Sequence, residues 1–212
     1  MIVDPSVLPV FFVSAFIVMI APGADLVFIV TNSVSGGKRS GTVATLGIAS
    51  GAVVHFIAAA LGISAIILSS EIAYDVVRFM GAGYLAWIGF QYLSTKAPIE
   101  AAQVADRKPT LKIYRQGVFT NLLNPKAILF NLSFVPQFVS IGYGPVWLQM
   151  LVLGGILIGI GLLINLSIVM MSNQLSLVMK SRQQAFGNYF EKAAGLMLIG
   201  IAVYIAVSRR PV

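Results

Sequence analysis

Long apolar stretches alternate with short polar ones along the whole chain. Six apolar runs can be separated, each close to the roughly 20 residues that a membrane-spanning helix needs. The runs are continuous and do not alternate between apolar and polar residues, which favours helices over the strands of a lipid-facing barrel. The pattern predicts an all-α integral membrane protein of six transmembrane helices, near Val7–Val30, Thr42–Leu68, Val76–Leu93, Gly117–Val139, Val146–Ser172 and Tyr189–Val207.

Composition supports the same class. Apolar residues make up 58% of the 212 positions and charged residues 10%, whereas soluble domains average about 45–50% and about 25%. Six spans would use nearly all of the apolar residues, which excludes an appended ATPase domain. The first run is too long for a signal-peptide core and follows Asp4 with no basic segment before it, so we expect it to be retained as the first span.

The basic residues indicate orientation and do not suggest a nucleic-acid partner. The net charge of +7 is scattered over short connections and not gathered on one face. The positive-inside rule then makes the odd connections cytoplasmic and places both termini outside. Arg209 and Arg210 oppose this, so a five-span or seven-element chain stays open. The odd side carries Lys38, Arg39, Lys96, Arg107, Lys108, Lys112, Arg115, Lys180, Arg182 and Lys192; the other side carries Arg78, Arg209 and Arg210.

A polar segment divides the chain into two halves. Residues 94–116 are the longest hydrophilic stretch, and we interpret them as a cytoplasmic linker between residues 1–93 and 117–212. Each half then has three spans. Because three is odd, the second half crosses the membrane in the opposite direction, which predicts two inverted three-helix repeats, as in many secondary transporters.

A proline marks the first span of each half. When Pro22 is aligned with Pro125, three further pairs coincide, namely Phe16 with Phe119, Ala24 with Ala127 and Leu26 with Leu129. Proline removes a backbone donor and clashes with the preceding turn. The first helix of each half is therefore predicted to be broken at its proline, although a kink that only shapes packing is the simpler alternative.

Asn124 and Pro125 form a favourable helix start, with Asn as the N-cap and Pro in the first helical position. The N–H groups and the positive dipole end of this half-helix would point into the membrane interior, where they favour an anion. Lys126 adds a positive charge there. The arrangement calls for a negative partner, either Asp25 or the carboxylate of a substrate.

Three ionisable residues, Asp25, His55 and Lys126, lie inside apolar runs. A charge there costs about 2.5–3.5 kcal/mol on insertion scales, so each should be paired, hydrated or functional. Lys126 is too far from either interface for its stem to reach water, and for it and Asp25 we favour a binding role over a structural ion pair. For His55, a structural role and a proton-handling role both stay open.

Small residues indicate helix packing. Gly47, Gly51 and His55 recur every four residues, so they share one helix face that should meet another helix and not lipid. Gly155 and Gly159 repeat the GxxxG spacing and are also interpreted as packing residues. Such pairs serve contacts within one chain or in a homo-oligomer. Asn165 is either interhelical glue or a site-lining amide, and we favour glue.

At these positions the sequence resembles the LysE/RhtB family of bacterial amino-acid exporters. The similar segments, in chain order, are APGAD with GGKRSG, LGIASGAVVH, GAGYLAWIGF and NLLNPKAILFNLSFVPQF. Together they extend over most of the chain. The family usually has a second proline in the first motif, where this chain has Ala24.

The resemblance implies a secondary exporter of amino acids or analogues in the bacterial cytoplasmic (inner) membrane, a multi-pass protein driven by the proton gradient. It transfers roles to Pro22, Gly23, Asp25, Asn124, Pro125 and Lys126. Because the spans offer no second acidic site, we prefer small neutral substrates over lysine. The candidate substrate-binding or coupling residues are Pro22, Gly23, Asp25, His55, Asn121, Asn124, Pro125 and Lys126.

Other function classes are less consistent with the sequence. A metal-ion exporter of related fold would need several carboxylate, His or Cys ligands, and the spans offer only Asp25 and His55 beside Lys126. No nucleophile and base motif appears in the spans, so we predict neither an enzyme nor a cofactor. A membrane assembly subunit that transports nothing stays open. The expected partners are an amino acid, protons and the lipid bilayer.

Overall fold

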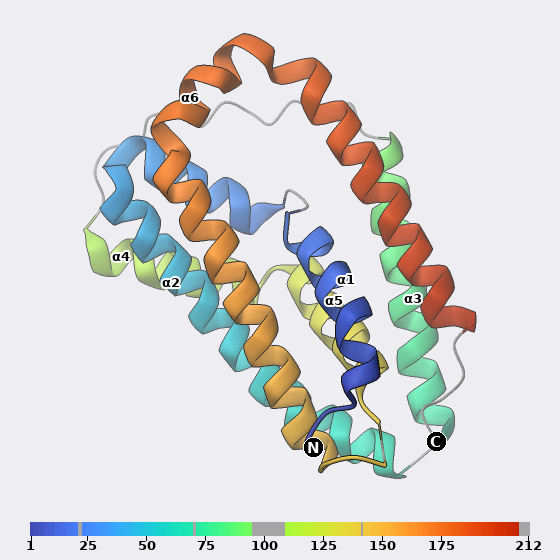
Figure 1. The fold of residues 1–212 in the computed structure, drawn as a ribbon. Coiled ribbons are helices and arrows are strands. Elements are labelled where there is room, and N and C mark those ends of the chain that lie inside the picture. The colour runs from blue at the N-terminus through green and yellow to red at the C-terminus, as the bar shows by residue number, and fades with distance from the viewer. Residues whose placement is uncertain (21–22, 70, 95–108, 141, 208–212) are drawn as a thin grey trace.

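Figure 1 shows the computed structural model, which describes residues 1–20, 23–69, 71–94, 109–140 and 142–207. Every regular element in these ranges is a helix, which confirms the all-α prediction for the described part of the chain. The elements are η1 (Pro5–Val7), α1 (Leu8–Ile20), α2 (Ala24–Ser69), α3 (Glu71–Ser94), α4 (Thr110–Leu122), α5 (Pro125–Phe134), η2 (Val135–Phe138) and α6 (Val146–Val207).

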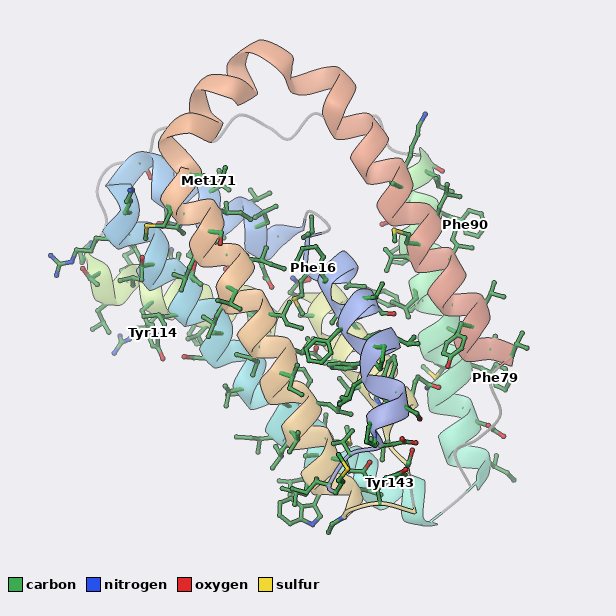
Figure 2. All side chains as sticks on the ribbon, viewed as in Figure 1. Phe16, Phe79, Phe90, Tyr114, Tyr143 and Met171 are labelled. Atoms are coloured by element: carbon green, nitrogen blue, oxygen red, sulfur yellow. The ribbon has the colours of Figure 1, made fainter. Side chains whose placement is uncertain are left out.

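The outside of the molecule is rich in large apolar side chains. Phe16, Phe79, Phe90 and Met171, all labelled in Figure 2, are each more than half exposed. Two helical stretches within the described residues, Ala24–Gly62 and Val146–Met171, are long and apolar enough to cross a membrane. An apolar exterior of this kind is typical of a protein that lipid surrounds. The count of six spans and the two inverted repeats stay predictions.

The predicted loop around Lys38 is reduced to one residue. Helix α2 is interrupted only at Gly37, whose φ of 75° and ψ of −176° lie in a region that glycine alone adopts readily. The chain turns there between a short helical segment, residues 24–36, and a long one, residues 38–69. Gly37 therefore replaces a loop of several residues.

Helix α6 joins the two spans that the sequence placed at Val146–Ser172 and Tyr189–Val207. Figure 1 shows it bending between two arms, the first beside α2 and the second beside α3, and both neighbours pack against it. The hydropathy pattern separated the spans because the stretch between them is polar. That stretch contains no proline, however, and its Lys, Arg and Gln residues are good helix formers.

Helix α4 begins at Thr110, seven residues before the predicted span at Gly117. Residues 110–116 of the predicted linker are therefore helical. Lys112 and Arg115 are both exposed on this part of the helix, and their charge hides the helix from a search for apolar length. Pro109 directly precedes the helix, where its missing N–H costs no helical hydrogen bond.

Glycines bring α2 and α4 into close contact. The Cα atoms of Gly47 and Gly117 face each other so closely that a Cβ at Gly47 would lie 3.1 Å from the Cα of Gly117. A Cβ at Gly51 would lie 2.9 Å from the Cβ of Asn121. The predicted packing role of Gly47 and Gly51 is confirmed, and their partner is a helix of the same chain.

The GxxxG pair in α6 is a different case. A Cβ at Gly155 or Gly159 would meet no atom within 4 Å, so these residues do not pack closely against another helix in the described part of this chain, and packing against a second copy stays a prediction. Gly154, one position earlier, does pack, because an added Cβ would lie 2.6 Å from the ring of Phe56. One residue rotates a helix by about 100°, and sequence spacing alone does not say which of two neighbouring glycines faces the core.

A cluster of aromatic side chains connects α1 with α5 and η2. Phe11 of α1 lies with its ring centroid 5.6 Å from that of Phe134 in α5 and 5.1 Å from that of Phe138 in η2. Phe130 stacks on Phe134 at 4.6 Å. All four rings are buried. This cluster fixes α1 against α5 and so brings the ends of the broken helices together.

Candidate functional site

Two pairs of helices are separated by short breaks. Helix α1 ends at Ile20 and α2 begins at Ala24; α4 ends at Leu122 and α5 begins at Pro125. The carbonyl of Gly23 accepts the first hydrogen bond of α2 from the N–H of Val27, at 3.0 Å. The predicted helix start at Asn124 and Pro125 is confirmed, because the Asn124 carbonyl accepts from the N–H of Ile128 at 3.0 Å.

Asp25 joins the two breaks. It lies in the first turn of α2, where the positive end of the helix dipole favours a carboxylate. Its Oδ2 accepts a hydrogen bond from Nδ2 of Asn121 at 2.8 Å, and its Oδ1 accepts one from Nδ2 of Asn124 at 3.0 Å. The start of α2 is thus tied to both sides of the break between α4 and α5.

His55 supports the same break from α2. Its Nε2 lies 3.2 Å from the backbone carbonyl oxygen of Asn121. A carbonyl only accepts, so Nε2 is the donor and carries a proton. The same oxygen accepts from the N–H of Asn124 at 3.1 Å. His55 therefore stabilises a carbonyl at the end of α4 that continued helix would otherwise satisfy, and the predicted position of its ring against another helix is confirmed.

A cavity of about 120 Å³ opens beside these breaks. Water needs about 10–15 Å³ by the same kind of measure, so the space admits several waters or one small organic molecule. Its walls come from α1, α2, α4, α5 and α6, and the lining residues are Val18, Met19, Gly23, Asp25, Leu26, Thr45, Ile48, Ala49, Ala52, Phe56, Asn121, Asn124, Ala127, Phe130, Asn131, Leu157, Ile158, Gly161, Leu162 and Asn165.

Two helix N-termini reach this cavity. Gly23, Asp25 and Leu26 represent the start of α2, and Asn124 with Ala127 the start of α5. Each start carries N–H groups without a partner in its own helix and the positive end of a dipole. Asp25 is the acidic residue among the lining residues. The cavity thus offers both a carboxylate for a cation and two helix starts for an anion.

The predicted site residues fall into four groups. Gly23, Asp25, Asn121 and Asn124 line the cavity together. His55 contacts the backbone carbonyl of Asn121 and does not line the cavity. Pro22 lies outside the described residues. Pro125 and Lys126 are the first two residues of α5, but their side chains lie outside the described part, so the proposed pairing of Lys126 with Asp25 stays a prediction.

Three polar lining residues were missed or weighed differently. Asn165 lines the cavity, so of its two suggested roles the site-lining one holds. Thr45 and Asn131 had not been singled out. The sequence carried a signal for Asn131, since it lies seven residues, or two helical turns, after Asn124. Thr45 gave no such signal, because a threonine whose hydroxyl bonds back to its own helix, here to the Gly41 carbonyl at 3.0 Å, is common in membrane helices.

No group of three His, Cys, Asp or Glu side chains lies together in the part of the chain that the structure describes. Among the described lining residues, the polar groups are one carboxylate, several amides and a hydroxyl.

Comparison with known proteins places the chain. The family model of the LysE type translocators matches residues 16–209. An uncharacterized membrane protein of Vibrio cholerae is 28% identical over 94% of this chain and 96% of its own length. A homoserine/homoserine lactone efflux protein of Salmonella typhi is 24% identical over 88% of this chain and 93% of its own length. A leucine efflux protein of an Enterobacter species is 32% identical, over 61% and 62%. No solved structure matches. The chain belongs to the LysE type translocator family.

Proposed function

We propose that this protein is a secondary active exporter of small neutral amino acids or their analogues across the bacterial cytoplasmic membrane. The observation that carries the proposal is the meeting of Asp25 with two helix starts at one cavity. Family membership supports export, and the relatives named for homoserine and leucine efflux support an amino acid as the cargo.

The chemistry of an amino acid fits the two kinds of group in the cavity. Its ammonium pairs with the Asp25 carboxylate, which already accepts from two amide donors and has further lone pairs. Its carboxylate lies against the N–H groups at the start of α5, with Lys126 as the nearby cation. Interrupted helices hold substrates in this way in several transporter folds.

Proton coupling follows from competition at Asp25. A proton on this carboxylate removes the countercharge of the substrate ammonium, so proton binding promotes release. A substrate ammonium in turn keeps the proton away. Inward movement of a proton and outward movement of an amino acid are thereby exchanged, and the two inverted halves alternate the access of the cavity between the two sides of the membrane.

Efflux from loaded cells tests the proposal. Cells that express the protein are loaded in turn with alanine, homoserine and leucine, and release is followed for the wild type, Asp25→Asn and Lys126→Ala at equal membrane abundance. We expect both variants to lose most of the release of whichever amino acid the wild type exports. Asp75→Asn is the control, since Asp75 lies on α3 and does not line the cavity. Undiminished release in both cavity variants would refute the site.

A further inference from the structure

The cavity has a polar end and an apolar end. On α2, the lining residues run from Thr45 through Ala49 and Ala52 to Phe56, all on one helix face. On α6, Leu157, Gly161 and Asn165 line it at intervals of one turn. Each helix therefore contributes a polar residue at one end of the cavity and an apolar residue at the other.

The two helices run antiparallel, and contacts fix their register. A Cβ at Gly154 would lie 2.6 Å from the Phe56 ring, and a Cβ at Gly41 would lie 3.0 Å from Cγ1 of Val169. Gly41 and Phe56 are fifteen residues apart on α2, and Gly154 and Val169 are fifteen residues apart on α6. The two helices therefore keep one register from the first contact to the second. Figure 1 shows the same arrangement for α2 and the first arm of α6. Phe56 thus lies level with the Leu157 end, and Thr45 with the Asn165 end.

The apolar end belongs to the main hydrophobic core. Phe56, Leu157 and Phe130 of α5 are buried members of one cluster, with Ala52 and Ile158 packed against it. The Asp25 cluster lies between one and two turns away along α2, because Asn121, which donates to Asp25, packs on Gly51, five residues before Phe56. A molecule whose ammonium contacts Asp25 can therefore extend a side chain of a few carbon atoms towards Phe56.

We propose that the side chain of the exported amino acid occupies this apolar end, which selects an aliphatic side chain over a hydroxylated or charged one. The inference rests on the proposed function and adds a substrate class to it. Ala52 sets the depth of the subsite, because it lies one turn before Phe56 on the same face and its methyl group leaves space between the two residues. Asn131, next to Phe130 on α5, is the polar group that would favour a hydroxyl instead.

L-Norvaline and L-homoserine form the sharpest ligand pair, since their side chains differ only by a terminal methyl or hydroxyl group. Equilibrium binding to the purified protein in detergent is measured for both and for L-alanine. We expect norvaline to bind about tenfold more tightly than homoserine, because an apolar subsite discriminates against an added hydroxyl by about this much or more.

Two filling variants locate the side chain. Ala52→Val should weaken norvaline binding by about fivefold or more and alanine binding much less, because the added methyl groups occupy the part of the cavity that only the longer side chain reaches. Ala58→Val is its control, as Ala58 is exposed on the same helix. Gly161→Ala narrows the cavity from α6, where a Cβ would meet only the Met19 sulfur at 3.5 Å; Gly159→Ala is the matched control with no atom within 4 Å.

The outcomes separate the two claims. The apolar subsite is refuted, and the proposed function stands, in either of two cases. In the first, alanine and homoserine bind and norvaline binds no more tightly than homoserine. In the second, the filling variants weaken the binding of all three ligands equally. If none of the three amino acids binds, the proposed function fails and the subsite fails with it.

Discussion

The partners of the Asp25 carboxylate are the most informative contacts of a single residue in this protein. The sequence predicted a cationic partner for a carboxylate inside a membrane span. The structure gives it two amide donors, Asn121 and Asn124, at 2.8 and 3.0 Å. Both donors are neutral, so these two hydrogen bonds leave the carboxylate its negative charge; the pairing of Asp25 with Lys126 stays a prediction. Residue type alone did not reveal this partner, because asparagine is as often a packing residue in membrane helices.

His55 is a positioning residue for the same cluster. We expect His55→Ala to lower amino-acid binding and to reduce the free energy of unfolding by about 0.5–1.5 kcal/mol, the usual net value of a hydrogen bond, because the Asn121 carbonyl loses a donor. His55→Gln keeps an N–H donor and should restore part of the binding. Thermal unfolding and ligand binding in detergent measure both effects. Equal losses in the Ala and Gln variants would contradict a hydrogen-bonding role.

Asp4 and Tyr143 give stability a pH dependence outside the spans. The Ser6 backbone N–H, at 2.8 Å, and then the Ser6 hydroxyl hold the pKa of Asp4 below its ordinary 3.8. Its contribution is therefore present above that pH and is lost as the pH falls through the lowered pKa. The Asp4 charge raises the pKa of Tyr143 above its ordinary 10.0. The contribution of Tyr143 to stability is therefore present below pH 10 and is lost only as the pH rises through the raised pKa.

Asp4→Asn tests the acidic limb, because asparagine is an equally good helix cap that does not titrate. We expect the wild type to be the more stable protein near neutral pH and the two melting temperatures to converge as the pH falls below about 4. Melting is followed in detergent across that range. A constant difference between the two proteins would show that Asp4 does not contribute in this way.

Close packing at glycines governs the elements. A Cβ at Gly47 would collide with the backbone carbonyl oxygen of Tyr114, which no side-chain rotation relieves. We expect Gly47→Ala to lower the free energy of unfolding by about 1–3 kcal/mol, as overpacked cores do. Gly155→Ala is the matched control, since nothing lies within 4 Å and the change should be neutral or slightly stabilising. Similar melting temperatures for the two variants would refute the α2–α4 contact.

The elements also show what hydropathy predicts and what it does not. Proline and its N-cap predicted the start of α5 because both act locally on the backbone. Apolar length did not show the first turns of α4, which are polar, and did not show that the polar stretch in the middle of α6 is helical. The sequence could not show that Gly154 faces the core and Gly155 faces outward, because the rotation of α6 about its axis depends on how it packs against its neighbouring helix.

At the scale of the whole molecule, one cavity connects the separate parts. The aromatic cluster of Phe11, Phe130, Phe134 and Phe138 holds α1 against α5, and the glycines hold α2 against α4. Together they bring two interrupted helices to Asp25. Of the residues that the sequence singled out, Gly23, Asp25, Asn121 and Asn124 line this cavity, and their binding role stays a prediction. The sequence did not predict the apolar end, which forms from residues of three helices that look like ordinary core.

Equilibrium binding of radiolabelled L-leucine to the purified protein tests the central claim most directly, because it needs neither a membrane potential nor a transport cycle. We expect the wild type and Asp75→Asn to bind it with equal affinity and Asp25→Asn to bind it at least about tenfold more weakly, since a charge-assisted contact is lost. Unchanged leucine affinity in Asp25→Asn would contradict the account, because the cavity would then hold the amino acid without the carboxylate at its helix breaks.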